Sequence, residues 1–252
     1  MRLRAFTLAE LLVTVAVIAV LVTLVGAAMS SAQRKADAAK CMGNLRQLVS
    51  ANLAYAADND GQFCPAQDMT NTIRWHGVRA HPRAAFDPTK GPLAPYLGID
   101  RRVKICPALG RVLKGFASFE EGSGGYGYNS AYVGGTPIDP FTPARVVAIT
   151  SPSTVVMFAD TAFPRPTGLQ EYAFAEPWQW EDYKGRLRGA LEPSVHFRHI
   201  DRANVGWCDG HLSAEPYSKL GKINLYGGDA KHWKVGWFGP SNDNGYWRPK
   251  RD

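Results

Sequence analysis

The sequence predicts an α+β protein in which one long N-terminal helix packs, through its second half, on a C-terminal antiparallel sheet with loop-rich insertions. Residues 11–29 carry no charged side chain, which indicates a helix able to cross a membrane. Apolar residues then recur every three or four positions up to residue 56, as on one face of a helix. Short β-branched runs bounded by turn residues occur late in the chain and indicate antiparallel strands.

The uncharged segment matches a bilayer in length. As a helix it would rise about 28 Å, close to the hydrocarbon thickness of a membrane. Arg2 and Arg4 precede it, so the N-terminus is predicted to be cytoplasmic and the rest of the chain to lie outside. The same short positive flank also fits a secretory signal peptide, with a cut near residues 27–32.

One carboxylate, Glu10, stands at the start of the uncharged segment. In lipid without a partner it would cost about 2–3 kcal/mol or more. A signal peptide has no use for such a residue, whereas a carboxylate that meets a cation inside a membrane or a helix bundle does.

Residues 5–13, AFTLAELLV, resemble the cleavage and methylation motif of type IV prepilins and type II secretion pseudopilins. The resemblance implies that a prepilin peptidase cuts between Ala5 and Phe6 and that the new amine of Phe6 is methylated. It also implies that Glu10 pairs with the terminal amine of a neighbouring subunit. The family usually has Gly before the cut, where this chain has Ala5. The implied organisation is a leader (1–5), a transmembrane and assembly helix (6–29), its amphipathic continuation (30–60) and an extracytoplasmic pilin-like domain (61–252).

The helix is predicted to continue past the membrane for about 50 residues in total, because no proline interrupts residues 6–57. The turn-forming residues 58–61, Asp-Asn-Asp-Gly, supply its end. The predicted buried face comprises Ala32, Ala36, Ala39, Met42, Leu45, Leu48, Val49, Asn52, Leu53 and Ala56.

The C-terminal part is predicted to consist of short strands separated by loops. Asp209-Gly210 is a two-residue hairpin signal. Strands are predicted at 145–149, 154–159, 195–199, 203–208 and 211–214, and little regular structure at 65–140 and 162–190.

A second stretch of the chain carries the same family resemblance. His199, then nine residues, then Asp209-Gly210-His211 is similar to the processing-associated region of pilin-like proteins, as are residues 105–107, 125–129 and 156–160. His199 and Asp209 could approach across paired strands and form a metal site with Asp160 and His211. The favoured alternative is that His199 and Asp209 bond to backbone groups and fix a tight turn. Because some pseudopilins hold calcium in C-terminal loops, the resemblance makes calcium a candidate cofactor.

The four cysteines permit three pairings, and the sequence does not choose between them. Their spacings, at Cys41, Cys64, Cys106 and Cys208, fit no zinc pattern. Disulfides are permitted outside the cytoplasm.

The composition argues against two functional classes. The net charge of +7 is not concentrated in a basic run or a nucleic-acid-binding module, so we predict no nucleic-acid partner. Ser151, Ser153 and Ser194 lack the sequence context of a nucleophile, and the carboxylates are scattered, so we predict no enzyme.

The predicted function is structural: a subunit of a type IV pilus or a type II secretion pseudopilus. Its predicted partners are a prepilin peptidase, its methyltransferase and other pilin or pseudopilin subunits. The predicted location is the inner membrane, single-pass, and the filament after assembly. Two alternatives remain: a membrane-tethered module whose tryptophan-rich loops bind a glycan or another surface ligand, and a secreted hydrolase behind a signal anchor.

Overall fold

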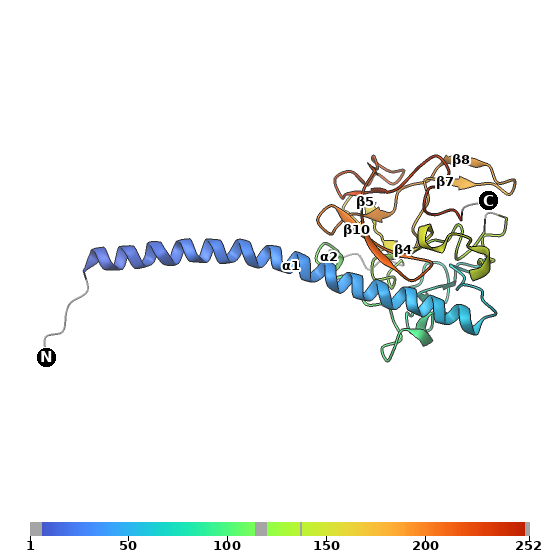
Figure 1. Ribbon diagram of the computed structural model, residues 1–252, viewed down its shortest axis with the longest axis horizontal. Coiled ribbons are helices and arrows are strands. Elements are labelled where there is room, and N and C mark those ends of the chain that lie inside the picture. The colour runs from blue at the N-terminus through green and yellow to red at the C-terminus, as the bar shows by residue number, and fades with distance from the viewer. Residues whose placement is uncertain (1–6, 114–119, 137, 250–252) are drawn as a thin grey trace.

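A long, gently curved helix that projects from a globular domain dominates the computed structural model (Figure 1). The structure describes residues 7–113, 120–136 and 138–249. Ala5 and Phe6, where processing is predicted, lie outside the described residues. Helix α1 (Leu8–Asp58) has 51 residues, so it is about 77 Å long at 1.5 Å per residue. The α+β prediction, with one long apolar helix followed by an antiparallel sheet, is confirmed.

The ends of α1 follow from local side chains. Thr7 is the N-cap, and its hydroxyl accepts a hydrogen bond from the backbone N–H of Glu10. At the other end, Asp60 (φ 52°) and Gly61 (φ 75°) adopt left-handed conformations, and the Gly61 N–H bonds the carbonyl of Ala56 at 2.8 Å. The predicted stop at residues 58–61 is confirmed.

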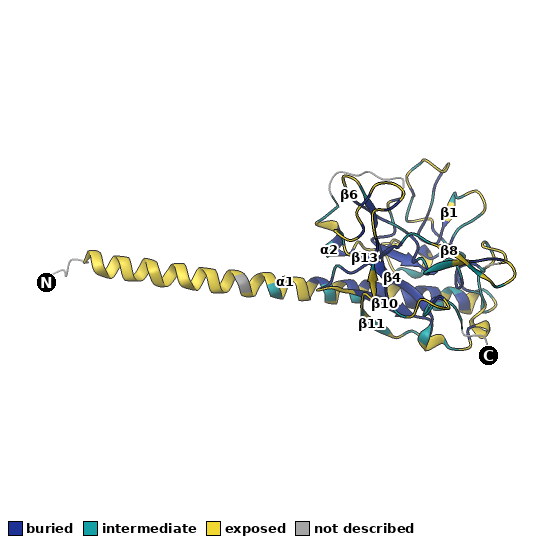
Figure 2. Ribbon diagram, turned by 90° about the horizontal axis from the view of Figure 1, so that it is seen from above, coloured by how far each residue is buried: buried dark blue, intermediate teal, exposed yellow. Residues whose placement is uncertain are grey.

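The two halves of α1 differ in burial (Figure 2). The side chains described between residues 8 and 30 are all exposed, and Asp37 is the first buried residue. The predicted buried face is confirmed from Leu45 onward but is wrong at Ala32, Ala36 and Ala39, which are exposed. Helical periodicity marks an apolar face, but the position at which the domain begins to cover that face depends on tertiary structure.

The second half of α1 packs on a four-stranded antiparallel sheet with the order β11-β10-β4-β3. Gly206 of β10 permits this close approach, since a Cβ there would lie 2.4 Å from Cγ2 of Val49 on α1. The strands of this sheet are β3 (Tyr126–Tyr128), β4 (Val156–Asp160), β10 (Arg202–Trp207) and β11 (Leu212–Pro216).

Each face of this sheet borders its own hydrophobic core. On one face, Leu45 and Leu48 of α1 share the larger cluster with Phe158 of β4, which pairs with Gly206. On the other face, Val205 of β10 packs with Trp247 and other C-terminal side chains. The sheet is therefore a middle layer between α1 and the C-terminal loops.

The remaining elements are short and lie in the connections around this framework. The strands are β1 (Ile73–Arg74), β2 (Gly77–Val78), β5 (Phe163–Arg165), β6 (Gly168–Gln170), β7 (Gln179–Glu181), β8 (Leu187–Ala190), β9 (Val195–His196), β12 (Lys219–Leu220) and β13 (Val235–Trp237). The helices are α2 (Pro107–Gly110) and the 3-10 turns η1 (Ala94–Tyr96), η2 (Val146–Ala148) and η3 (Pro152–Thr154).

Several strand predictions are confirmed and others are wrong. The 203–208 and 211–214 strands form the β10–β11 hairpin, and 154–159 contains most of β4. The strand predicted at 145–149 is instead the 3-10 turn η2, where Val147 is 87% exposed. The 65–140 region contributes β3 to the central sheet, so the prediction of little regular structure there is wrong for that segment.

Candidate functional site

The first candidate site is the N-terminal turn of α1, where Glu10 completes a capping box with Thr7. Oε2 of Glu10 accepts hydrogen bonds from the Thr7 N–H at 2.9 Å and the Thr7 hydroxyl at 2.8 Å. The carboxylate thus stabilises the start of its own helix, where its negative charge also complements the helix dipole. Sequence reasoning assigned Glu10 a role between subunits and missed this one, although Thr-x-x-Glu is a recognisable pattern.

Beyond this turn, α1 is long and apolar enough to cross a membrane, and none of the apolar window is buried within the chain. Exposed leucine, valine and isoleucine side chains surround the helix on every side from Leu8 to Val25. A water-exposed surface of this kind is unfavourable, so it requires another apolar environment.

The second candidate site is a disulfide clamp, which we define as the contacts that Asp37, Cys41 and Asn44 of α1 make with residues 104–111. Cys41 and Cys106 form a disulfide with their Cα atoms 5.2 Å apart, across 65 residues of sequence. The other two cysteines, Cys64 and Cys208, are buried free thiols. Of the pairings left open by the sequence, the structure therefore forms one bridge, and it joins the helix to the domain.

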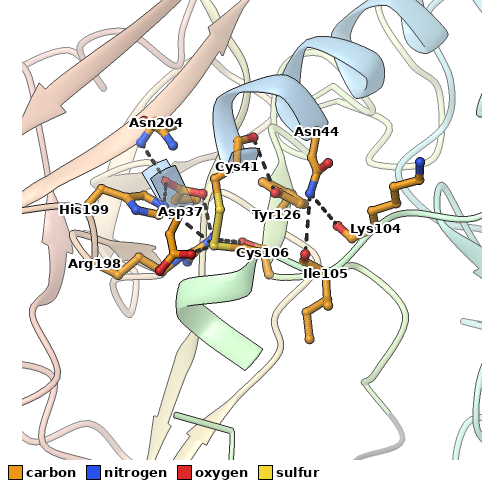
Figure 3. Close-up of a disulfide and its surroundings, with 12 residues drawn as sticks. Asp37, Cys41, Asn44, Lys104, Ile105, Cys106, Tyr126, Arg198, His199 and Asn204 are labelled. Carbon is orange, nitrogen blue, oxygen red and sulfur yellow. Dashed lines mark hydrogen bonds and ion pairs between the residues drawn. A yellow bond between two sulfur atoms is a disulfide. The ribbon is translucent and has the colours of Figure 1, made fainter. Parts of the chain in front are cut away.

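In the disulfide clamp, polar contacts lie on both sides of the disulfide (Figure 3). Asp37 forms an ion pair with Arg111 just after α2. One turn further along α1 than Cys41, the Asn44 amide donates to the carbonyl of Lys104 at 3.3 Å. The segment 104–111 is thus fixed to α1 at three successive points.

The motif residue His199 lies directly against the disulfide clamp. Its Nε2 is 3.6 Å from Sγ of Cys106 and 3.4 Å from Oδ2 of Asp160. Burial lowers the pKa of His199, as does the neighbouring Arg198 guanidinium, while Asp160 acts in the opposite direction. The net lowering keeps the imidazole neutral at pH 7.

Arg198, the residue before His199, joins the same buried cluster. Its Nη2 donates to Oδ1 of Asp160 at 2.6 Å, and its Nε donates to Sγ of Cys106 at 3.2 Å. The second carboxylate oxygen of Asp160 accepts the backbone N–H of Asn204 at 2.7 Å. The negative charge of Asp160 is therefore compensated where it is fully buried.

Asp209 and Gly210 lie at the opposite end of β10 from His199. Trp207 N–H bonds the His211 carbonyl at 3.0 Å, which closes a three-residue loop with Gly210 at φ 96° in place of the predicted two-residue turn. Asp209 Oδ1 is 2.6 Å from Nδ1 of His211. The predicted approach of His199 to Asp209 is wrong, because the strand that separates them in sequence also separates them in space.

For the metal candidates, the structure brings together Asp160 and His199 but not Asp209. The turn alternative describes Asp209, whose Oδ1 accepts the backbone N–H of His211 at 3.1 Å, but not the His199 ring, which lies against Asp160 and Cys106. The backbones of His199 and Arg202 exchange N–H···O bonds at 3.0 and 3.2 Å around two left-handed residues. The site around Asp160 does not suit calcium, because the metal-ligating neighbours of this carboxylate among the described residues are two sulfurs and an imidazole, whereas calcium prefers oxygen ligands. Sequence reasoning missed Cys106 as a neighbour of His199, because the two are far apart in the chain.

Most tryptophans belong to the interior. Trp75 and Trp247 are fully buried, and Trp207 and Trp237 are nearly so. Trp180 on β7 is 49% exposed. The tryptophans therefore serve mainly as packing residues.

Comparisons with protein-family models, with curated proteins and with solved structures found no match.

Proposed function

We propose that this chain is a structural subunit of a type IV pilus or a type II secretion pseudopilus. The chain is made as a precursor, cut between Ala5 and Phe6 by a prepilin peptidase and methylated on Phe6. The observation that carries this proposal is that the apolar half of α1 is exposed along its length, while the other half is fixed to a folded domain.

The exposed half of α1 supports both membrane residence and helix-to-helix assembly. Each large apolar side chain that leaves water contributes about 1.5–3 kcal/mol. A bilayer shields this apolar surface from water before assembly, and the equivalent helices of other subunits shield it afterwards. Because both environments are apolar, moving the helix from one to the other changes the hydrophobic free energy little. Packing and polar contacts between helices therefore determine whether subunits assemble.

Glu10 supplies the polar contact in this proposal. After the cut, the terminal amine stands on Phe6, directly before the N-cap Thr7. The capping bonds use Oε2 of Glu10, and a carboxylate can accept further hydrogen bonds at its second oxygen. Capping its own helix and pairing with the amine of a neighbour are therefore compatible roles, and the pairing fixes the stagger between subunits.

The location follows from the same features. The precursor lies in the inner membrane as a single-pass protein, with Arg2 and Arg4 on the cytoplasmic side and the domain outside. Its other partners are pilin or pseudopilin subunits, and the methyltransferase acts on the newly exposed amine.

Mass spectrometry of the mature chain tests the processing step. We expect a chain that begins at Phe6 and carries one added methyl group. A chain that retains residues 1–5 in the presence of the peptidase contradicts the proposal, and a start between residues 28 and 33 indicates a signal peptide instead.

Two substitutions at Glu10 separate capping from pairing. Glu10→Gln keeps a side chain that can complete the capping box but removes the charge, whereas Glu10→Ala removes both. We expect both variants to be processed and both to fail in filament assembly, measured as sheared filaments or as crosslinked oligomers. Normal assembly of Glu10→Gln would show that the charge has no role between subunits.

A further inference from the structure

The disulfide and the residues that lie against the disulfide clamp bring together a set of metal-ligating atoms that the proposed function leaves unexplained. One sulfur each from Cys41 and Cys106, a ring nitrogen of His199 and a carboxylate oxygen of Asp160 lie within 4.8 Å of one another. All four residues are buried. They come from α1, the start of α2, the end of β4 and the turn before β10, so only the complete fold assembles them.

Two separations within this set match edges of a zinc tetrahedron. With zinc bonds of about 2.3 Å to sulfur and about 2.0 Å to nitrogen or oxygen, tetrahedral geometry places N and S about 3.5 Å apart and N and O about 3.3 Å apart. His199 Nε2 lies 3.6 Å from Cys106 Sγ and 3.4 Å from Asp160 Oδ2. Nε2 of His199 therefore lies at distances from Cys106 Sγ and Asp160 Oδ2 that would allow all three atoms to bind one zinc ion.

We propose that reduction of the Cys41–Cys106 disulfide creates a structural zinc site formed by Cys41, Cys106, His199 and Asp160. A dithiol gives two electrons and two protons to the S–S bond and itself becomes a disulfide. A phosphine gives two electrons, takes up the oxygen of one water to become a phosphine oxide, and that water supplies the two protons that complete the thiols. Binding of one Zn²⁺ then releases those two protons and leaves two coordinated thiolates. The bonded sulfurs must move apart from about 2.05 Å to about 3.8 Å, the edge expected between two sulfurs on zinc.

Charge balance favours this metal in the buried cluster. Two thiolates, the Asp160 carboxylate, Zn²⁺ and the Arg198 guanidinium sum to zero, as Asp160 and Arg198 do beside the disulfide. The hydrogen bonds from Arg198 to Cys106 Sγ and to Asp160 Oδ1 need not break, because each would support a zinc ligand from outside. Two sulfurs and one imidazole select zinc over calcium or magnesium, which prefer oxygen ligands.

Four protein ligands leave no open position, so the proposed zinc is structural and not catalytic. It replaces the covalent bridge between α1 and the domain with a coordinate one. The disulfide clamp thereby holds α1 in both oxidising and reducing surroundings. This zinc site is independent of the proposed assembly into filaments.

Zinc binding by the full chain in detergent micelles provides the test. After reduction with a phosphine, equilibration with zinc and removal of excess metal, we expect about one zinc per chain by elemental analysis and none in the oxidised chain. Cobalt(II) in place of zinc should give the absorption bands of a tetrahedral thiolate site. A reduced chain that retains no zinc, or an oxidised chain that retains as much, overturns the proposal.

Two variants assign the metal to these residues. His199→Ala should weaken zinc binding at least about 100-fold, since loss of even an outer partner costs 10–100-fold. Near-ultraviolet circular dichroism of the oxidised variant first establishes that it folds as the parent does. The zinc affinities of the reduced variant and the reduced parent are then compared. The matched control Cys64→Ser/Cys208→Ser removes the two free thiols and should bind zinc as the parent does.

A stability measurement keeps the proposal testable if reduction loosens the domain. Zinc should raise the Tm of the reduced parent and leave that of the oxidised parent unchanged. Zinc that survives His199→Ala but is lost with Cys64→Ser/Cys208→Ser contradicts the assignment, as does a reduced chain whose Tm does not respond to zinc.

Discussion

The two halves of α1 belong to one continuous helix, yet they are stabilised in different ways. Residues 8–36 have no buried side chain among those described, whereas the face that begins at Asp37 is covered by the domain. In the second half, a disulfide, an ion pair and a side-chain-to-backbone bond fix the helix along about 10 Å of its axis, a span of about two turns. In the first half, the side chains of Glu10, Thr14 and Thr23 bond to backbone groups of their own helix and its N-cap.

The two halves of α1 therefore have different roles. The second half contributes to the free energy of unfolding of the domain, because it is part of the hydrophobic core. The first half contributes nothing to that core and leaves its apolar surface available to lipid or to other subunits. Substitutions should therefore affect the stability of the domain or the assembly of the protein according to the half in which they lie.

The largest expected effect comes from removing the disulfide. Cys41→Ser/Cys106→Ser releases a loop of 65 residues, for which chain entropy predicts a loss of about 4 kcal/mol in the free energy of unfolding. Urea titration of the oxidised chain in micelles, followed by tryptophan fluorescence, measures it. The reduced, metal-free parent should match the variant, and a loss under about 1 kcal/mol would show that the polar contacts alone hold the second half.

A matched pair of leucines compares the two halves directly. Leu48 is 1% exposed and Leu12 is 62% exposed. Leu48→Ala should lower the free energy of unfolding by about 3 kcal/mol through lost burial and a cavity, and Leu12→Ala should leave it within about 0.5 kcal/mol of the parent. Urea titration of both variants measures the difference, and equal losses would mean that the exposed half also supports the domain.

Gly206 tests how closely the second half must approach the sheet. Gly206→Ala places a Cβ against Val49, and we expect a loss of about 2 kcal/mol from overpacking. Adding Val49→Ala removes the opposing methyl groups, so the double variant should lose less than the sum of the two single variants. Strict additivity in thermal or urea unfolding would contradict a direct contact between these positions.

Local sequence signals predicted which helices and strands form better than they predicted which of these elements contact one another. The length of α1 follows from the absence of proline and from the turn residues at 58–61, and the β10–β11 hairpin follows from Asp209-Gly210. The start of the covered face at Asp37 was not predictable, since Ala32 and Ala36 continue the same periodicity without a domain to cover them.

The candidate site depends on contacts between distant parts of the sequence. Glu10 was identified as special by charge alone, and its bond to Thr7 follows a short-range pattern. Cys106, however, meets Cys41 and His199 only because α2 and the turn before β10 pack at the same point of α1. Nothing in the spacing of the cysteines encodes that convergence, so neither the pairing nor the metal-ligating set could be derived before the fold was known.

The smallest expected effect is a pH dependence that arises from His199, beside the disulfide clamp. Burial and Arg198 lower the pKa of His199 in the folded chain, against the opposing effect of Asp160, whereas in the unfolded chain the imidazole has an ordinary pKa of about 6.5. The unfolded state therefore binds this proton first as the pH falls, and the folded state loses stability between about pH 7.5 and 5.5.

His199→Gln keeps an amide that can donate to Asp160 but cannot titrate in this range. Its free energy of unfolding should fall less than that of the parent between those two pH values, and urea titrations at each pH measure the difference. Other buried groups contribute equally to both chains and cancel in the comparison. An unchanged pH dependence would show that His199 is protonated alike in both states. Protonation of His199 would then have no effect on the contacts that hold the second half of α1.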